Sequence, residues 1–236
     1  EVSNVFSPIM NSAQAKNIKI IENPKVKTVV EKTISDKDLK ASDAILKMYN
    51  KEISENFLSQ ILSIGMVGIK RKLVPTRWSI TATDDIIGKN ILNEIQDYNE
   101  IDYSLYFGGH LGNYYLVLFF PGIWSYELFE VDLQNEVNIW SKSGKKYSYD
   151  YEDFYGRKNY AEETAGGYYA ARLPVLEKLR ELKRNGSVLV IRLIDEDYQI
   201  PLGVWVCREA TRIALKNKVN LEFTNKESLV NYVKAF

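Results

Sequence analysis

The run IDYSLYFGGHLGNYYLVLFFPGIWSYELFEV, residues 101–131, contains the clearest strand signals in the chain. Aromatic and β-branched side chains fill it, and glycine and proline interrupt it at regular intervals, as they do between neighbouring strands. The segment EVNIW, residues 136–140, continues the same composition. This pattern predicts an antiparallel β meander at the centre of the chain.

Helical signals precede this run. The sequence predicts helices over residues 35–49 and 54–63, and a third that begins at Asp84 and Asp85 and continues to about residue 98. Isoleucines recur along this third helix at helical spacing, and the helix dipole favours negative charge at its start. Residues 1–34 show no sustained periodicity, so we expect an extended arm there, with short strands at residues 18–21 and 26–30.

After the meander, the signals alternate between helix and strand. Leucines share one helical face over residues 173–182, and Pro174 either opens that helix or joins it through a kink to the residues before it. Residues 187–194, SVLVIRLI, predict a buried strand, and residues 201–217 predict a turn into another helix. A last helix ends the chain.

Together these elements predict an α+β fold, in which the central antiparallel meander packs with helices from the N-terminal and C-terminal parts. The expected organisation is an extended arm over residues 1–34, a helical part over residues 35–100 and a β-centred part over residues 101–236. The two larger parts are expected to form one compact body.

The composition excludes several classes of protein. The 236 residues carry 31 basic and 31 acidic side chains, so no bulk charge attracts nucleic acid or an anionic membrane. A single cysteine, Cys207, rules out an internal disulfide and cysteine-rich zinc sites in this chain. The apolar runs are too short to span a bilayer, which favours a cytoplasmic protein without a membrane partner. Because residue 1 is Glu, we expect a trimmed or partial chain.

One candidate functional stretch is KRKLVPTRWSITATDD, residues 70–85. Its cations can meet phosphates while Trp78 stacks on a base, and Asp84 with Asp85 can hold a divalent metal or act as acid and base. The alternative is structural: the cations are solvated, the tryptophan belongs to the core, and the aspartates cap a helix.

A second candidate is the tyrosine-rich segment over residues 147–172. Tyr147, Tyr149 and Tyr151 alternate at strand spacing and so share a face, which can serve as a platform for bases or sugars. Gly166 and Gly167 precede a helical segment and can bring free amides close to an anion. The alternative is a tight turn around which tyrosines pack.

Other common sites have little support in the sequence. His110 is the only histidine, which excludes a histidine-based metal cluster and favours a place in a hairpin turn. Ser79 has no recognisable base partner, and Cys207 lies in an apolar run typical of a buried thiol, although Arg208 can lower its pKa if it is accessible. Neither a GxxxxGK[ST] loop nor a strand-linked GxGxxG motif is present.

Four long strings carry a resemblance to a known family: LVPTRWSITATDD (residues 73–85), PGIWSYE (121–127), GRKNYAEETAGGYYAARL (156–173) and PLGVWVCREATRIAL (201–215). In content, order and spacing they resemble the Nre family of archaeal DNA repair proteins. The resemblance covers residues 45–216 and implies a cytoplasmic protein of DNA damage repair that associates with the replication sliding clamp through a short C-terminal motif. It implies no settled catalytic activity.

The resemblance also implies a shared functional surface, which we expect to form one pocket for a nucleic acid or a nucleotide. Its acid-base or metal-binding groups would be Asp84, Asp85 and Glu209. Its binding groups, in which arginines contact phosphate and aromatic rings stack, would be Arg77, Trp78, Ser79, Thr81, Gly156, Arg157, Lys158, Tyr160, Gly166, Gly167, Tyr168, Tyr169, Arg172, Trp205 and Arg208.

The sequence departs from the family pattern in two places. Members carry a cysteine-based, zinc-finger-like element near the N-terminus, and this chain has no cysteine there, so zinc is not expected, whereas a divalent metal remains open. The end, KESLVNYVKAF, fills a clamp-binding motif poorly with Lys226, Leu229, Tyr232 and Val233, and a terminal amphipathic helix explains it as well.

Three functions follow from these observations. The first is a DNA repair factor, enzyme or not, that handles a nucleic acid or nucleotide in the expected pocket. The second is a non-catalytic adaptor that links repair factors to the sliding clamp. The third is an enzyme acting on a small nucleotide or sugar phosphate, a reading that the neutral net charge favours over a tight duplex binder.

Overall fold

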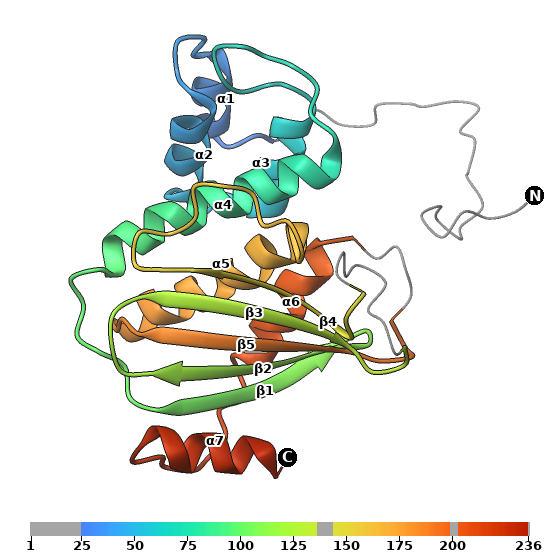
Figure 1. The fold of residues 1–236 in the computed structure, drawn as a ribbon. Helices are drawn as coiled ribbons and strands as arrows, with labels where there is room; N and C mark the ends of the chain where they lie inside the picture. Colours follow the sequence, from blue (N-terminus) through green and yellow to red (C-terminus); the bar gives the residue numbers. More distant parts are fainter. Residues whose placement is uncertain (1–24, 136–143, 199–202, 236) are drawn as a thin grey trace, which may run out of the picture.

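The structure is a computed structural model that describes residues 25–135, 144–198 and 203–235. Within these ranges the chain forms helices and one five-stranded sheet (Figure 1). The helices are α1 (Thr28–Ser35), α2 (Ala41–Tyr49), α3 (Glu55–Ser63), α4 (Thr76–Ile95), α5 (Ala165–Leu182), α6 (Trp205–Ala214) and α7 (Lys226–Lys234). The strands are β1 (Ser104–His110), β2 (Asn113–Phe120), β3 (Ser125–Asp132), β4 (Tyr147–Glu152) and β5 (Ser187–Ile194). The predicted α+β class is confirmed.

The order of the strands differs from the predicted meander. The sheet runs β1-β2-β5-β3-β4, so β5 lies between the second and third strands of the central run. β5 pairs antiparallel with β2 and parallel with β3. Parallel pairing needs a long crossover connection, and the segment containing β4 and α5 supplies it between β3 and β5. The expected strand at residues 136–140 lies outside the described residues.

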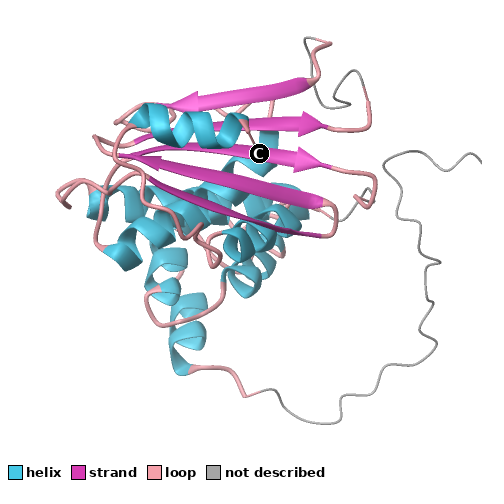
Figure 2. Cartoon of the chain, turned by 90° about the horizontal axis from the view of Figure 1, so that it is seen from below, coloured by secondary structure: helices cyan, strands magenta, loops and turns pink. Residues whose placement is uncertain are grey.

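The two faces of the sheet are covered differently (Figures 1 and 2). Helices α4, α5 and α6 lie on one face, and α7 lies on the other. The larger core cluster joins the helical face to residues of the N-terminal helices, whereas a smaller cluster holds α7 through Leu229, which is fully buried against Leu105, Leu116 and Leu118. We refer below to the α5 side as the inner face and the α7 side as the outer face.

The N-terminal helices differ from the prediction at two points. Residues 28–35 form α1, so the prediction of an extended arm with a strand at residues 26–30 is wrong at this end of the arm. The helix predicted over residues 35–49 is also wrong in part, because Asp36 interrupts it: its carboxylate accepts hydrogen bonds from the N–H groups of Asp38 and Leu39. By contrast, α3 begins as predicted, with Ser54 as its cap.

Helix α4 begins eight residues earlier than predicted. Ser79 and Thr83 lie on its buried stripe, two turns and one turn before Ile87 respectively, and both are fully buried. Because these positions hold small polar residues, the apolar periodicity that marks a helix is absent there. Asp84 and Asp85 therefore lie within the helix and do not cap it.

The remaining elements follow the predictions closely. Helix α5 continues through Pro174, so the residues before and after the proline form one helix. His110 ends β1, and Leu111 and Gly112, with φ of 52° and 70°, make the tight turn of the hairpin. None of the helices in the described ranges is both long and apolar enough to cross a membrane.

Candidate functional site

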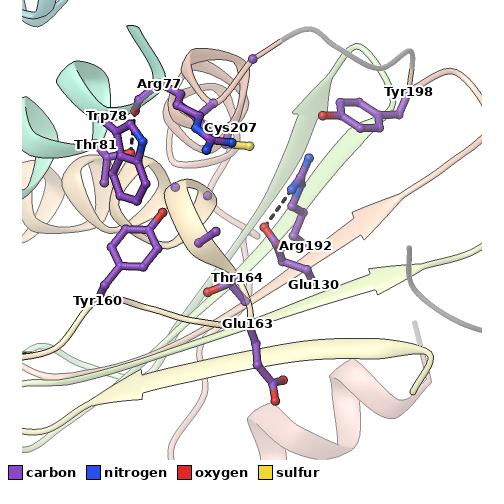
Figure 3. A pocket seen from close by; sticks show the side chains of 15 residues that line it. Arg77, Trp78, Thr81, Glu130, Tyr160, Glu163, Thr164, Arg192, Tyr198 and Cys207 are labelled. Carbon is purple, nitrogen blue, oxygen red and sulfur yellow. Dashed lines mark hydrogen bonds and ion pairs between the residues drawn. The ribbon is translucent and has the colours of Figure 1, made fainter. Parts of the chain in front are cut away.

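A cavity of about 460 Å³ opens beside the N-terminus of α5 (Figure 3). Its walls come from the start of α4, the loop before α5, the inner face of β3 and β5, and the segment that leads into α6. The lining residues are Arg77, Trp78, Thr81, Glu130, Tyr160, Glu163, Thr164, Ala165, Gly166, Gly167, Arg192, Tyr198, Gly203, Val204 and Cys207. Four segments far apart in the sequence thus meet in one place.

Aromatic rings form one wall of this cavity. The rings of Trp78 and Tyr160 lie 5.2 Å apart, and Tyr160 in turn stacks on Tyr169 at 5.6 Å. Trp78 is 42% exposed, and the guanidinium of Arg77 lies 5.4 Å from its ring centre. An exposed ring beside an exposed cation is the arrangement that receives a base and its phosphate.

The first turn of α5 forms a second wall. Ala165 has a φ of 48°, which turns the chain sharply into the helix. A Cβ on Gly166 would lie 2.7 Å from Val204 Cγ1, and a Cβ on Gly167 would lie 2.5 Å from Glu130 Oε1, so both positions need glycine for close packing. The first N–H groups of a helix have no acceptor within its regular hydrogen-bond pattern. Here the Gly167 N–H donates to the Thr164 carbonyl at 3.1 Å, and Ala165 and Gly166 lie along the cavity.

Asp150 on β4 fixes the loop that leads into this turn. One of its carboxylate oxygens accepts hydrogen bonds from the N–H groups of Glu163 and Thr164, at 3.0 and 2.8 Å, and from the Thr164 hydroxyl. The Glu163 carboxylate accepts a hydrogen bond from the Tyr149 N–H and points away from the other labelled side chains (Figure 3). The position of the α5 N-terminus is therefore set by β4.

A buried ion pair forms the floor of the cavity. Arg192 on β5 donates to Glu130 on β3 at 2.8 Å and to the side-chain oxygen of Asn113, and its guanidinium lies 5.2 Å from the ring of Tyr198. Burial raises the pKa of Glu130 above its usual value, although Arg192 opposes this shift. Burial likewise raises the pKa of Cys207, as expected for a buried thiol.

Six of the residues expected at the site line this cavity: Arg77, Trp78, Thr81, Tyr160, Gly166 and Gly167. They come from two of the four strings, residues 73–85 and 156–173. The other expected residues do not line the cavity.

The three expected acidic residues belong to other networks. Asp84 lies between α4 and α6, where it accepts a hydrogen bond from Arg208, and burial raises its pKa to about 7. Asp85 pairs with Lys89 at 2.7 Å and more loosely with Arg172. Glu209 pairs with Arg212 at 3.0 Å.

Two expected arginines are held by protein groups. Arg172 is buried and donates to Glu152 at 2.7 Å, and Glu152 also accepts from the indole N–H of Trp124. Arg157 donates to the backbone carbonyls of Tyr151 and Tyr160 and pairs with Asp150. These guanidinium groups therefore stabilise β4 and the loop after it.

The remaining expected residues surround the cavity without lining it. Ser79 and Tyr168 are fully buried, and the hydroxyl of Tyr169 accepts a hydrogen bond from the Ala161 N–H. Lys158 is exposed, and Trp205 is 39% exposed at the start of α6. Gly156, with a φ of 71°, turns the chain beside Arg172.

Sequence reasoning missed the floor of the cavity. Arg192 interrupts the otherwise apolar strand SVLVIRLI, and Glu130 takes an inward position in a strand whose other inward residues include Tyr126 and Leu128. A charged residue at a core position is the signal that could have found both. Thr164 and Ala165 also line the cavity, although the sequence analysis did not predict them as site residues.

The geometry offers little to a metal ion. In the ranges that the structure describes, no group of three or more His, Cys, Asp or Glu side chains is arranged to hold one. Asp84, Asp85 and Glu209 do not form such a group, because each is directed to a different arginine or lysine.

Comparisons show that the sequence is similar to known proteins along most of its length. Residues 1–141 match the family described as "Archaeal Nre, N-terminal", and residues 152–236 match "Archaeal Nre, C-terminal". The DNA repair protein NreA of Archaeoglobus fulgidus is 44% identical over 92% of this chain and 56% of its own length. The DNA repair protein NreA of Haloferax volcanii is 37% identical over 92% of this chain and 52% of its own length.

A third relative is also similar to this chain along almost its whole length. The DNA repair protein NreB of Archaeoglobus fulgidus is 36% identical over 98% of this chain and 58% of its own length. The chain thus spans just over half the length of these relatives, and no solved structure matches it. With family matches over residues 1–141 and 152–236, this chain belongs to the archaeal Nre family.

Proposed function

We propose that this protein acts in DNA repair and that its cavity binds a nucleotide, either free or within a single strand of nucleic acid. The observation that carries the proposal is the meeting of Trp78, Tyr160 and Arg77 with the first turn of α5 around one cavity. The relatives' shared description as DNA repair proteins supports the biological setting.

Each wall has a chemical role in this proposal. A base stacks against Trp78 and Tyr160, which tolerate any base because every base has a π-face. A phosphate receives hydrogen bonds from Arg77 and from the N–H groups of Ala165 and Gly166 at the start of α5. The neutral net charge favours a site with few phosphate contacts over one that follows a long duplex.

The third function, an enzyme for a small nucleotide or sugar phosphate, is favoured by two observations. A volume of about 460 Å³ falls in the range of small-molecule sites. Glu130, a buried carboxylate with a raised pKa, forms part of the cavity wall, and such a group can act as a general acid or base. This candidate shares the site of the main proposal.

The adaptor function gains less support from the structure. A clamp-binding segment must present its apolar and aromatic residues to the partner. Here Leu229, which is part of α7, is fully buried, and Tyr232 and Val233 pack against the outer face of the sheet. Binding through this segment would require α7 to leave the sheet.

Equilibrium binding tests the main proposal. Fluorescence anisotropy of a labelled oligonucleotide, dT12, should show binding to the wild-type protein that Trp78→Ala weakens by about 5- to 150-fold, the loss expected for one stacked base. Arg77→Ala should weaken it as well. Phe57→Ala, which removes an exposed aromatic residue from α3, and Arg184→Ala, which removes an exposed arginine, are the matched controls.

The same variants test the setting in cells. In a strain that lacks the protein, Arg184→Ala should restore survival after DNA damage, and the Trp78→Ala and Arg77→Ala variants should not. Wild-type affinity and full survival with Trp78→Ala would refute the proposal.

A further inference from the structure

Four aromatic rings lie together on the outer face of β3 and β4. Phe129 lies 4.4 Å from Tyr149 and 5.7 Å from Tyr147, and Tyr149 stacks on Tyr151 at 5.9 Å with the planes 17° apart. We call Phe129, Tyr147, Tyr149 and Tyr151 the aromatic row. Tyr147 is 38% exposed and Tyr151 is 57% exposed.

The aromatic row has no part in the core. None of its four rings belongs to the core clusters of the described residues, and α7 packs on residues of β1, β2 and β5. Strand β4 is instead held by its inward residues, Asp150 and Glu152, through Thr164 and Arg172. Two exposed tyrosine rings beside two half-buried rings, all outside the core clusters, indicate a binding surface.

Lysines flank both ends of the aromatic row. Lys145 lies with its ammonium group 5.4 Å from the ring of Tyr147, and Lys146 beside it is exposed. Beyond the other end, Lys158 is exposed in the loop after β4. Rings with cations beside them match bases joined by phosphates.

The backbone edge of β4 argues against a peptide as the occupant. A peptide would add to an edge strand through free backbone groups. On β4, the Tyr149 N–H already donates to Glu163, and the Tyr151 carbonyl already accepts from Arg157. Two of the backbone groups that a peptide would use are therefore already occupied.

The aromatic row continues to the cavity around the edge of the sheet. Arg157 donates to the carbonyl of Tyr151 at 2.7 Å and to that of Tyr160 at 3.1 Å. Tyr160 forms the cavity wall with Trp78. A chain of contacts thus runs from the outer face of β4 to the cavity.

We propose that a single-stranded nucleic acid lies across the aromatic row and passes the β4 edge, so that one of its nucleotides enters the cavity. This inference rests on the proposed function and specifies its ligand as a strand of several nucleotides. Extruding one nucleotide into a pocket is easiest from a strand that is already unpaired.

The length of the ligand provides the test. Anisotropy with dT12 and competition with thymidine monophosphate should show that the wild-type protein binds the longer strand more tightly. The double variant Tyr147→Ala/Tyr151→Ala should weaken dT12 binding by at least about tenfold, the loss of one or two stacked bases, and leave thymidine monophosphate binding unchanged. Tyr147→Phe/Tyr151→Phe, which keeps both rings, should bind like the wild type.

Salt dependence adds a second readout. The double variant Lys145→Ala/Lys146→Ala should lower the slope of log affinity against log salt by about 1.4, because each phosphate contact to a single strand contributes about 0.7. The change Lys51→Ala, at an exposed lysine near α2, is the control and should leave the slope unchanged.

The outcomes separate this inference from the proposed function. Loss of binding with Trp78→Ala but not with the tyrosine double variant would overturn the inference alone. Loss of dT12 binding with the tyrosine double variant but not with Trp78→Ala would support binding at the aromatic row and refute binding in the cavity. A wild-type protein that does not bind dT12 would refute the inference, as would a dimer in sedimentation that the tyrosine double variant dissociates.

Discussion

Two of the buried arginine–carboxylate pairs on the helical side of the sheet differ in what surrounds them. Asp84 and Arg208 join α4 to α6, and protein atoms enclose both side chains. Glu130 and Arg192 join β3 to β5 and are equally buried by fraction, yet both also line the cavity. The first pair joins two helices, and the second forms the floor of the cavity.

This difference shows that burial and a shifted pKa do not by themselves mark a functional group. Burial raises the pKa of Asp84 and that of Glu130 alike. What distinguishes Glu130 is that a ligand can reach it, and access depends on the two glycines of α5 and the short side chain of Thr81 at the cavity wall.

The largest effect is expected from Arg208→Ala. This change leaves the Asp84 carboxylate buried without its cation, which costs about 3–5 kcal/mol of unfolding free energy. Arg192→Ala should cost less, because water in the cavity can solvate Glu130. Urea unfolding at pH 8 measures both, and equal losses would show that the cavity does not hydrate the second pair.

A smaller loss is expected from Gly166→Ala. The new methyl group would lie 2.7 Å from Val204 Cγ1, and overpacking of this kind costs about 1–3 kcal/mol. It should also weaken dT12 binding, because the first turn of α5 must move. The double variant Gly166→Ala/Val204→Ala removes the clash and should recover most of the stability, and failure to recover would place the strain elsewhere.

The two pairs should also give stability a pH dependence. The folded pKa of Asp84, about 7, lies above its usual value of 3.8, so its contribution to stability is complete below pH 4 and is lost as the pH rises through 7. Relative to Asp84→Asn, the wild type should therefore become less stable between pH 4 and pH 8. Glu130→Gln should remove a dependence of the same sign. Parallel pH profiles of the wild type and Asp84→Asn would contradict the first expectation.

The smallest effect is expected from chemical modification of Cys207 in the wild-type protein. Cys207 lines the cavity but is only 3% exposed, and burial raises its pKa. A thiol reagent at pH 8 should therefore modify it far more slowly than a free thiol, and a bound nucleotide should slow the reaction further. A rate equal to that of a free thiol would mean that the cavity floor is open to solvent.

The elements with apolar periodicity were predictable from the sequence. The stripe of Ile87, Ile91 and Ile95, the cap at Ser54 and the apolar run of β5 each gave the correct element type. The start of α4 was not predictable in this way, because hydroxyl groups and Asp84 occupy its buried stripe. Polar residues that fill a core position leave no periodic signal.

The site was predictable to the extent that its residues are exposed or glycine. Trp78, Arg77 and the two glycines were candidates from their types and neighbours, the family resemblance selected them, and they line one cavity. Arg172 was expected to contact phosphate, but it is held by Glu152, a partner that only the folded sheet brings to it. The sequence shows which side chains can bind an anion. Only the fold shows which of these side chains are already paired with a carboxylate of the protein.

The place of β5 in the sheet has a consequence for how the chain folds. The β1–β2 and β3–β4 hairpins form from local contacts, but neither pairs with the other. Until the ribosome has released residues 187–194, β2 and β3 each expose an unpaired apolar edge. Strand pairing over such a sequence separation is slow, and the interval favours aggregation. We therefore expect insertion of β5 to be the committing step of folding and the stage at which the nascent protein most needs a chaperone.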